Sequence, residues 1–180
     1  MTKNSKLKTR NASMLSISEK IAIAKELYGR WCDALSTGSG IAAQLRELSA
    51  RVEASGASCI RSGVADACRL CEREEGGSCC GAGIEDRYTP ELLLINLMLG
   101  ASLPESRHSA KSCHFLGECG CLLLARDIIC VNYLCGRLKR TIPPEELLAL
   151  QETNGSEMEL LFILHDRIRN FIRLLKCNCV

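Results

Sequence analysis

The residues of this sequence most able to do chemistry are its cysteines, of which there are 13 among 180 residues. The densest stretch, CRLCEREEGGSCC, spans residues 68–80 and combines a C-x-x-C spacing with two adjacent cysteines. Thiols at such spacings can form disulfides, exchange disulfides with a substrate or bind a metal ion. Eight of the cysteines fall into two groups along the chain, namely Cys68, Cys71, Cys79 and Cys80, followed by Cys113, Cys121, Cys130 and Cys135.

A disulfide framework is disfavoured because nothing in the sequence indicates export. Charged residues interrupt MLSISEKIAIAKEL at residues 14–27, whereas a signal peptide needs about 7–15 uninterrupted apolar residues. The most apolar window, LLLINLMLGA at residues 92–101, is about half as long as a transmembrane helix. We therefore predict a cytoplasmic protein without a membrane span. In that compartment thiols stay reduced, and dense cysteines indicate metal binding or catalysis.

The charge of the chain gives little indication of a macromolecular partner. Its formal net charge of +2 does not predict nucleic-acid binding. Residues 1–12 are expected to form a flexible basic tail, for which an anchor to anionic surfaces is the less favoured alternative. Metal ions are the predicted partners, and the sequence indicates no protein partner.

Hydrophobic periodicity predicts long helices at both ends of the chain. Apolar residues recur at spacings of three, four and seven across residues 13–56, where the STGSG stretch predicts a break between two helices. Residues 143–177 repeat this pattern after two prolines, with basic residues near the C-terminal end, where the helix dipole favours them. Cys32 and His165 lie on or near the apolar faces and are interpreted as core residues.

Between the terminal helices, residues 57–136 form the predicted cysteine-rich metal-binding core. Helical signals there are confined to TPELLLINLMLG, with Thr89 as N-cap, Pro90 at the first position and Gly100 at the end. The remainder is rich in glycine and serine and lacks periodicity. The expected fold is a single domain over residues 1–180 that is mainly α, with long N- and C-terminal amphipathic helices clamping an irregular core with little or no β-structure.

The pattern of the eight cysteines resembles a known bacterial family. Residues 68–80 are similar to its CxxC…CC signature. CHFLGECGCLLLARDIICVNYLC, at residues 113–135, is similar to its downstream half, in which C-x-F-L, G-C-x-L and a C precede an aromatic residue and a last C. These are the YkgJ-type proteins, described as zinc- or iron-chelating. The chain departs from them in the longer spacing before Cys79 and in Arg126-Asp127, where the family has Arg-Pro. The resemblance implies a metal centre built from all eight thiols.

Spacing along the chain leaves the number of metal positions open. A C-x-x-C pair across a tight turn can present both sulfurs to one ion. Cys79 and Cys80 would be strained as a disulfide, and in an extended segment their side chains point to opposite sides. They could therefore serve two adjacent sites, or one site through a bent backbone. Cys130 and Cys135 lie about 140° apart around a helix, so either a helix ends between them or they serve different sites.

The identity of the bound group also stays open. Thiolates suit closed structural zinc sites, iron ions and iron–sulfur clusters. We expect a non-catalytic protein that binds zinc or iron, and the alternative is an iron–sulfur protein with an electron-transfer or redox role. Thiol–disulfide exchange ranks last because no strand precedes Cys68. Additional candidate ligands are Cys59, Cys119 and His114, whereas Cys32, Cys177 and Cys179 are undecided.

Thiolates in this number need compensating positive charge. Eight thiolates with two divalent ions leave about four negative charges. Basic residues beside the cysteines could supply it, although for any one of them an ordinary solvated charge is the simpler interpretation. These residues are Arg69, Arg73, Arg126, Arg137, Lys139 and Arg140. Serine, histidine and acidic residues form no recognisable catalytic arrangement, so an enzyme is the less favoured interpretation.

Overall fold

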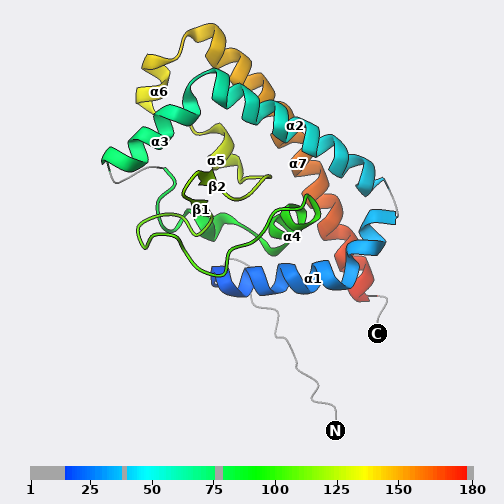
Figure 1. The fold of residues 1–180 in the computed structure, drawn as a ribbon. Helices are drawn as coiled ribbons and strands as arrows, with labels where there is room; N and C mark the ends of the chain where they lie inside the picture. Colours follow the sequence, from blue (N-terminus) through cyan, green and yellow to red (C-terminus); the bar gives the residue numbers. More distant parts are fainter. Residues whose placement is uncertain (1–14, 38–39, 76–78, 178–180) are drawn as a thin grey trace.

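The computed structural model describes residues 15–37, 40–75 and 79–177, and it is mainly helical, as the sequence predicts (Figure 1). The predicted basic tail at residues 1–12 lies outside the described residues. The elements in chain order are α1 (Ile17–Thr37), α2 (Ile41–Arg61), α3 (Val64–Glu75), the 3-10 turn η2 (Ile84–Arg87), α4 (Pro90–Met98), β1 (Leu116–Gly117), β2 (Gly120–Cys121), α5 (Ile128–Asn132), α6 (Gly136–Thr141) and α7 (Pro144–Cys177).

The two N-terminal helices form where hydrophobic periodicity predicts them. Ser16 begins α1 as a capping box, because its hydroxyl accepts from the Glu19 amide at 3.3 Å while the Glu19 carboxylate accepts from the Ser16 amide at 2.8 Å. The expected break is present, since α1 ends at Thr37 and α2 begins after Gly40, whose φ is 75°. Helix α2 continues to Arg61, five residues beyond the predicted boundary at residue 56.

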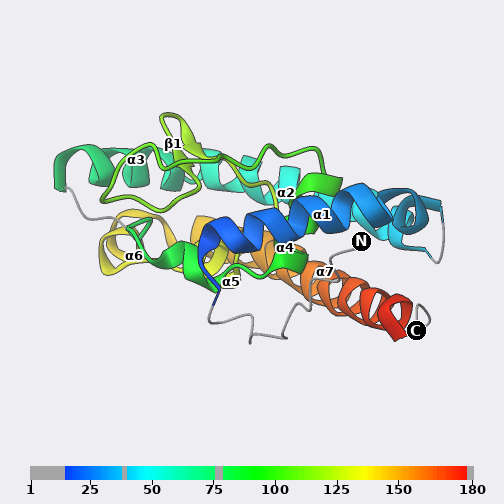
Figure 2. The ribbon, with the colours of Figure 1, turned by 90° about the horizontal axis from the view of Figure 1, so that it is seen from below.

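Helices α2 and α7 form the main scaffold, and they pack along one another (Figures 1 and 2). The bounds of α7, Pro144–Cys177, match the predicted C-terminal helix at residues 143–177 to within one residue. Apolar residues of both helices, including Leu48, Leu164 and Ile168, have no exposed surface and belong to the main hydrophobic core. The burial of these side chains supplies the main stabilisation of such a helix pair.

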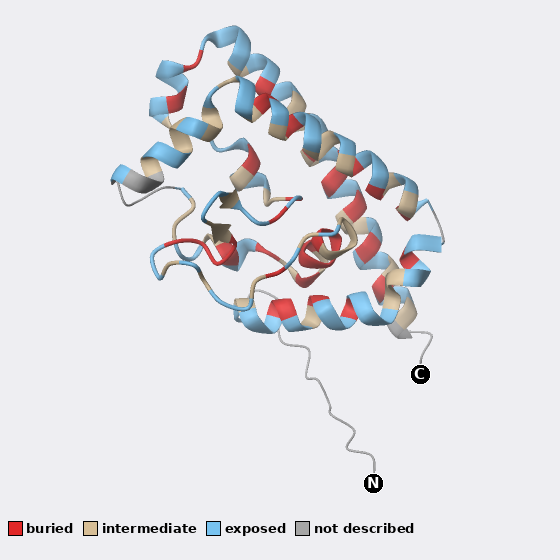
Figure 3. Ribbon diagram, in the orientation of Figure 1, coloured by how far each residue is buried: buried red, intermediate tan, exposed pale blue. Residues whose placement is uncertain are grey.

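Helix α4 is the most deeply buried element (Figure 3). The Thr89 hydroxyl accepts from the Leu92 amide at 3.2 Å, and Pro90 occupies the first turn, as predicted. Gly100 follows the helix with a φ of 91°, a left-handed conformation that favours glycine. The apolar run of α4, from Leu92 to Ile95, is buried on all sides between α1 and α7.

The middle of the chain is less irregular than the sequence predicts. Helix α3 was not expected, and the strands β1 and β2 form a short antiparallel hairpin in which Leu116 lies opposite Cys121. Helices α3 and α6 lie at the same end of the molecule (Figures 1 and 2). There a second, smaller core forms around Leu134, Leu138, Ile142 and Leu150.

Asn96 holds the loop before α5 against α4. Its side chain has no exposed surface. Its Nδ2 donates to the Leu92 carbonyl at 3.0 Å and to the Ala125 carbonyl at 2.8 Å, and its Oδ1 accepts from the amides of Leu124 and Ala125 at 2.9 Å and 3.0 Å. One buried amide thus satisfies backbone groups of a segment that has no helix or strand of its own.

Replacing this amide should destabilise the fold more than an ordinary surface change. Asn96→Ala leaves buried backbone donors and acceptors without partners, and we expect the free energy of unfolding to fall by roughly 2–4 kcal/mol. Asn170→Ala, at an exposed asparagine of α7, should cost less than about 0.5 kcal/mol. Urea unfolding followed by circular dichroism compares the two, and equal losses would contradict the role assigned to Asn96.

Candidate functional site

One group of thiols gathers at the end of the molecule formed by α3 and α6. Cys68 and Cys71 lie on α3, one turn apart on the same face, and not in the tight turn that the sequence predicts. Cys135 is the residue before α6, and Cys68 and Cys135 both pack against the second core. The charges of Cys79, Cys135 and Cys71 raise the pKa of the Cys68 thiol. We call Cys68, Cys71, Cys79 and Cys135 the α3 set.

A second group of thiols surrounds Tyr88. The Cys113 amide donates to the Cys80 carbonyl at 2.7 Å, which fixes these two residues side by side. The Tyr88 hydroxyl lies 3.8 Å from the Cys130 sulfur, within hydrogen-bonding range of a thiol. The charges of Cys121 and Cys130 raise the pKa of Tyr88, of Cys80 and of Cys113. We call Cys80, Cys113, Cys121 and Cys130 the Tyr88 set.

The adjacent residues Cys79 and Cys80 join the two sets. The charge of Cys79 raises the pKa of Cys68 in the α3 set. The charges of Cys130 and Cys121, in the Tyr88 set, raise the pKa of Cys80. A hydrogen bond between Cys79 and Cys80 raises the pKa of Cys80 more than burial does. Helix α5 ends at Asn132, between Cys130 and Cys135, which is one of the two outcomes that their spacing allows. The two residues then fall in different sets.

Burial is a main cause of the raised pKa of the thiols for which a shift is resolved in the two sets, and neighbouring thiols add to it in Cys68, Cys80, Cys113 and Cys130. Burial, followed by the charges of neighbouring cysteines, raises the pKa of Cys68 to about 11. Burial also raises the pKa of Cys113 to about 11. A disulfide-exchanging cysteine needs the opposite, a thiolate stabilised at a helix N-terminus, and Cys68 lies in the second turn of α3. The structure therefore gives Cys68 neither the position nor the pKa of such a nucleophile.

The donor chemistry fits a thiolate-binding metal, but the sulfur atoms do not form a closed ligand cage. In the described part of the chain, no group of three or more Cys, His, Asp or Glu side chains is arranged to hold a metal ion. Ions that bind sulfur sit about 2.3 Å from each thiolate, so ligation would require the neighbouring thiols to move together.

The additional candidate ligands differ in their surroundings. Cys59, near the end of α2, packs against the second core, as Cys68 does. The charge of Cys59 raises the pKa of the Cys68 thiol. Cys119 is exposed in the turn between β1 and β2. His114 is buried, its Nε2 lies 3.0 Å from the Pro104 carbonyl oxygen, and its ring packs edge-on against Phe115. These contacts give His114 a structural role.

The undecided cysteines lie outside both sets or outside the described residues. Cys32 is half-buried on α1, where its sulfur lies 3.9 Å from the Ser36 hydroxyl. Cys32 was interpreted as a core residue, and it is less buried than a core residue would be. Cys177 is the last residue of α7, and Cys179 lies outside the described residues.

Two of the basic residues beside the cysteines have different surroundings, and the charge of one of them, Arg126, lowers the pKa of Cys59, Cys121 and Cys130 against the larger effect of burial. Arg69 makes an exposed ion pair with Asp66 at 2.9 Å. Arg126 is instead partly buried, and the charges of Cys121, Glu157 and Cys59 raise its pKa although burial lowers it. The buried Glu157 was not anticipated, because the partners of a carboxylate on a helix face are not visible in local sequence.

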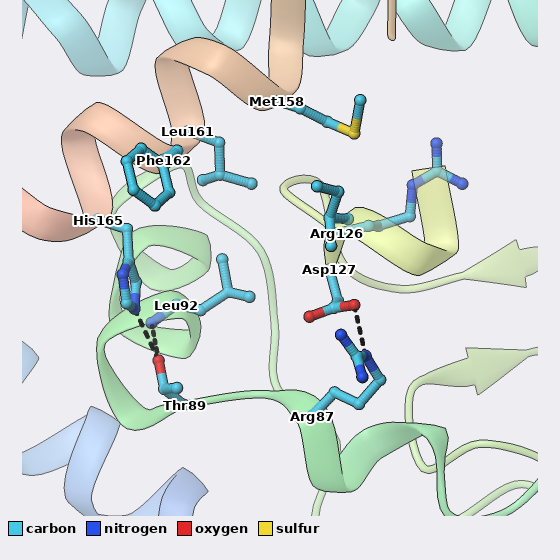
Figure 4. A pocket seen from close by; sticks show the side chains of 10 residues that line it. Arg87, Thr89, Leu92, Arg126, Asp127, Met158, Leu161, Phe162 and His165 are labelled. Atoms are coloured by element: carbon cyan, nitrogen blue, oxygen red, sulfur yellow. Dashed lines mark hydrogen bonds and ion pairs between the residues drawn. The ribbon is translucent and has the colours of Figure 1, made fainter. Parts of the chain in front are cut away.

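A cavity of about 200 Å³ is lined in part by Arg126 and Asp127, in the segment before α5 (Figure 4). Its walls are largely apolar and come from α4, α7 and Ile128 of α5. At one end Thr89 Oγ1 lies 2.8 Å from His165 Nε2, and at the other Arg87 Nε donates to Asp127 Oδ1 at 2.8 Å. His165 is thus a partly buried residue that links α7 to the N-cap of α4, in keeping with its predicted place in the core.

Comparison of the chain with protein-family models, with curated proteins and with solved structures finds no match. Each helix among the described residues is too short or too polar to cross a membrane.

His165 should make stability depend on pH. Burial lowers the pKa of His165, Arg169 lowers it further, and Glu91 and Asp166 oppose them. Below about pH 6.5, the unfolded chain therefore takes up a proton at His165 that the folded chain does not. Stability should fall as the pH drops through this window towards the lower, folded-state pKa.

Chemical unfolding at a series of pH values between 7 and 5 measures this dependence. His165→Gln should flatten the decline in unfolding free energy, because glutamine can still hydrogen-bond to Thr89 but does not titrate. His108→Gln, at an exposed histidine, is the matched control and should leave the wild-type decline in place. Parallel curves for all three proteins would exclude the assignment.

Proposed function

We propose that this chain binds zinc or iron through its cysteine thiolates, at two adjacent positions that share the Cys79–Cys80 pair, in a non-catalytic role. The observation that carries the proposal is the regrouping of the thiols by the fold. Cysteines far apart in sequence become electrostatic neighbours, four in the α3 set and four in the Tyr88 set. Four thiolates are the ligand number of closed tetrahedral metal sites.

We assign one metal position to each set, on the placement of its cysteines in the fold. In the α3 set, Cys68 and Cys71 present their sulfurs from one helix face, and Cys135 approaches beside the second core. In the Tyr88 set, a backbone hydrogen bond holds Cys80 against Cys113, and the hairpin and α5 bring in Cys121 and Cys130. The resemblance of the cysteine pattern to the zinc- or iron-chelating YkgJ-type family supports the same ligand residues.

A bound cation would remove the main electrostatic cost of this arrangement. Neighbouring thiols raise one another's pKa because two thiolates repel each other. A divalent ion reverses this effect by binding the deprotonated sulfurs and releasing their protons to solvent. The thiols of each set come from segments far apart in the sequence, so a bound metal would also cross-link these segments.

Serine substitutions should show how the metal content is distributed between the two positions. Protein purified without oxygen should carry metal, and Cys80→Ser or Cys68→Ser should each lose about half of it, because each removes a ligand from one set only. Cys32→Ser is the matched control, since Cys32 belongs to neither set, and should retain the full amount. Elemental analysis measures the content, and an absorption band near about 400 nm distinguishes an iron–sulfur cluster from zinc.

Two results would count against the proposal. One is less than one metal ion per wild-type chain after anaerobic purification. The other is a loss in Cys32→Ser as large as that in Cys68→Ser. If the protein is brown and contains iron, the same ligand sets hold an iron–sulfur cluster, and the alternative of a redox role replaces the structural one.

Metal removal should loosen one part of the fold and spare another. After chelation, the amides of Cys113, Leu122 and Tyr133 should exchange hydrogen faster, because their hydrogen bonds lie in the segments that carry the thiols. Amides in the paired faces of α2 and α7 should keep their protection, since burial in the main core stabilises them. Hydrogen exchange followed by mass spectrometry resolves the two regions, and identical exchange with and without chelator would contradict a metal-stabilised centre.

A further inference from the structure

The cavity between α4, α5 and α7 is separate in composition from the two cysteine sets, because among the described residues no cysteine lines it (Figure 4). Its apolar walls are formed by one residue of α4, one of α5 and three of α7, namely Leu92, Ile128, Met158, Leu161 and Phe162. The volume of about 200 Å³ exceeds that of apolar cavities of about 150 Å³ that bind benzene. The cavity therefore has room for one aromatic ring with a short substituent.

Two of the apolar walls reach the surface of the molecule. Phe162 is 75 % exposed and Ile128 is 54 % exposed, whereas Leu92 and Leu161 are buried and form an apolar floor. Exposed apolar side chains around a hollow are typical of a surface that a ligand covers. The ring of Phe162 and the sulfur of Met158 both make favourable contacts with aromatic rings. The walls therefore suit a flat aromatic body better than a polar one.

Arg87 lies at one end of the cavity and has hydrogen-bond donors to spare. Its Nε donates to Asp127 Oδ1 at 2.8 Å, and the same oxygen accepts from the Ile129 amide at 3.0 Å as the N-cap of α5. This ion pair holds the guanidinium by one edge. The Nη atoms of Arg87 make no hydrogen bond to any described residue, so their N–H groups can bind a ligand. A carboxylate is well suited to them, because its two oxygens can accept parallel N–H bonds from one guanidinium.

The charges around the cavity favour an anionic ligand. Two arginines, Arg87 and Arg126, and a single aspartate, Asp127, belong to the lining. At the other end, Thr89 Oγ1 lies 2.8 Å from the imidazole of His165. Burial lowers the pKa of His165, so this end carries no charge at neutral pH. The lining thus has one positive charge in excess, and charge complementarity favours a ligand with one negative charge.

We propose that this cavity binds a small aromatic carboxylate, with the ring against Phe162 and the apolar floor and the carboxylate bound by the Nη groups of Arg87. Asp127 holds Arg87 in place through its Nε, so the donors are oriented before the ligand arrives. The site uses no thiol and no metal ion. It is therefore a second binding function, independent of the one proposed above.

Removing the cation or the aromatic wall should weaken binding by different amounts. Arg87→Met should lower the affinity by about 10–100-fold, because hydrogen bonds to a charged group are lost. Phe162→Ala should lower it by about 3–10-fold through the lost ring contact. Arg51→Met is the control for the first variant, because Arg51 also pairs with an acid, Glu47, but lies on α2. Leu148→Ala, at an exposed apolar residue of α7, is the control for the second.

The experiment titrates the full chain with benzoate, phenylacetate and phenylpropionate, which differ in the length between ring and carboxylate. Calorimetry gives the dissociation constants, and the amide of the tightest binder is the uncharged comparison. We expect the amide to bind at least about 10-fold more weakly. Isotope-labelled methionine methyl groups locate the site by nuclear magnetic resonance. The Met158 signal should shift because Met158 lines the cavity, whereas that of Met98, which packs against the main core, should not.

Several results would overturn the proposal. One is a dissociation constant above about 1 mM for all three carboxylates with the wild-type chain. Others are binding that leaves the Met158 signal in place, equal affinity for the carboxylate and its amide, or equal affinity in Arg87→Met and Arg51→Met. If Arg87→Met fails to fold, the amide comparison and the pair Phe162→Ala and Leu148→Ala give the decision. Metal content is measured separately, so a failure here leaves the proposed function untouched.

Discussion

Repulsion between neighbouring thiolates is the constraint on which the account of this molecule depends. Each ionised sulfur raises the free energy of ionising the next, and burial adds to that cost. In Cys68 and Cys113 burial is the largest cause of a pKa raised to about 11, and the charges of neighbouring thiols raise it as well. A fold that brings such groups together must keep them protonated or supply positive charge. A bound metal would supply that charge.

The helical scaffold tolerates this crowding because its stability comes mainly from the packing of apolar side chains. The paired faces of α2 and α7, together with the buried α4, form the main hydrophobic core. Single polar side chains next to this core hydrogen-bond to the irregular segments and hold them in place. Asn96 holds the loop before α5, and Tyr88 holds both the Asp127 amide, at 3.2 Å, and the Cys130 sulfur. The thiols are thus positioned by contacts that originate in the scaffold.

Local signals were enough to predict the scaffold. The periodicity of α1 and α7 and the Thr89-Pro90 start of α4 depend on residues within a few positions of one another, so the sequence shows them directly. Helix α3 was missed although VADACRLCEREE is amphipathic, because the segment is short and polar on average and leads into the glycine- and serine-rich stretch that the sequence predicts to be irregular. Pro143 and Pro144 marked the beginning of α7 to within one residue, since the helix starts at Pro144.

The arrangement of the site could not be predicted in the same way, because its contacts join residues far apart in the sequence. Along the chain, the eight cysteines divide into residues 68–80 and residues 113–135, but the fold pairs Cys135 with Cys68 and Cys80 with Cys113. That the adjacent Cys79 and Cys80 serve two metal sites stays a prediction. Glu157 and its partner Ser55 are 102 residues apart, which places them beyond any local pattern.

The central claim is that thiolates alone surround a metal in this chain. X-ray absorption at the metal edge, on protein purified and kept without oxygen, tests it most directly. The account predicts a first shell of about four sulfur atoms per metal at about 2.3 Å. A first shell dominated by nitrogen or oxygen, or the absence of a metal edge from the wild-type protein, would contradict it.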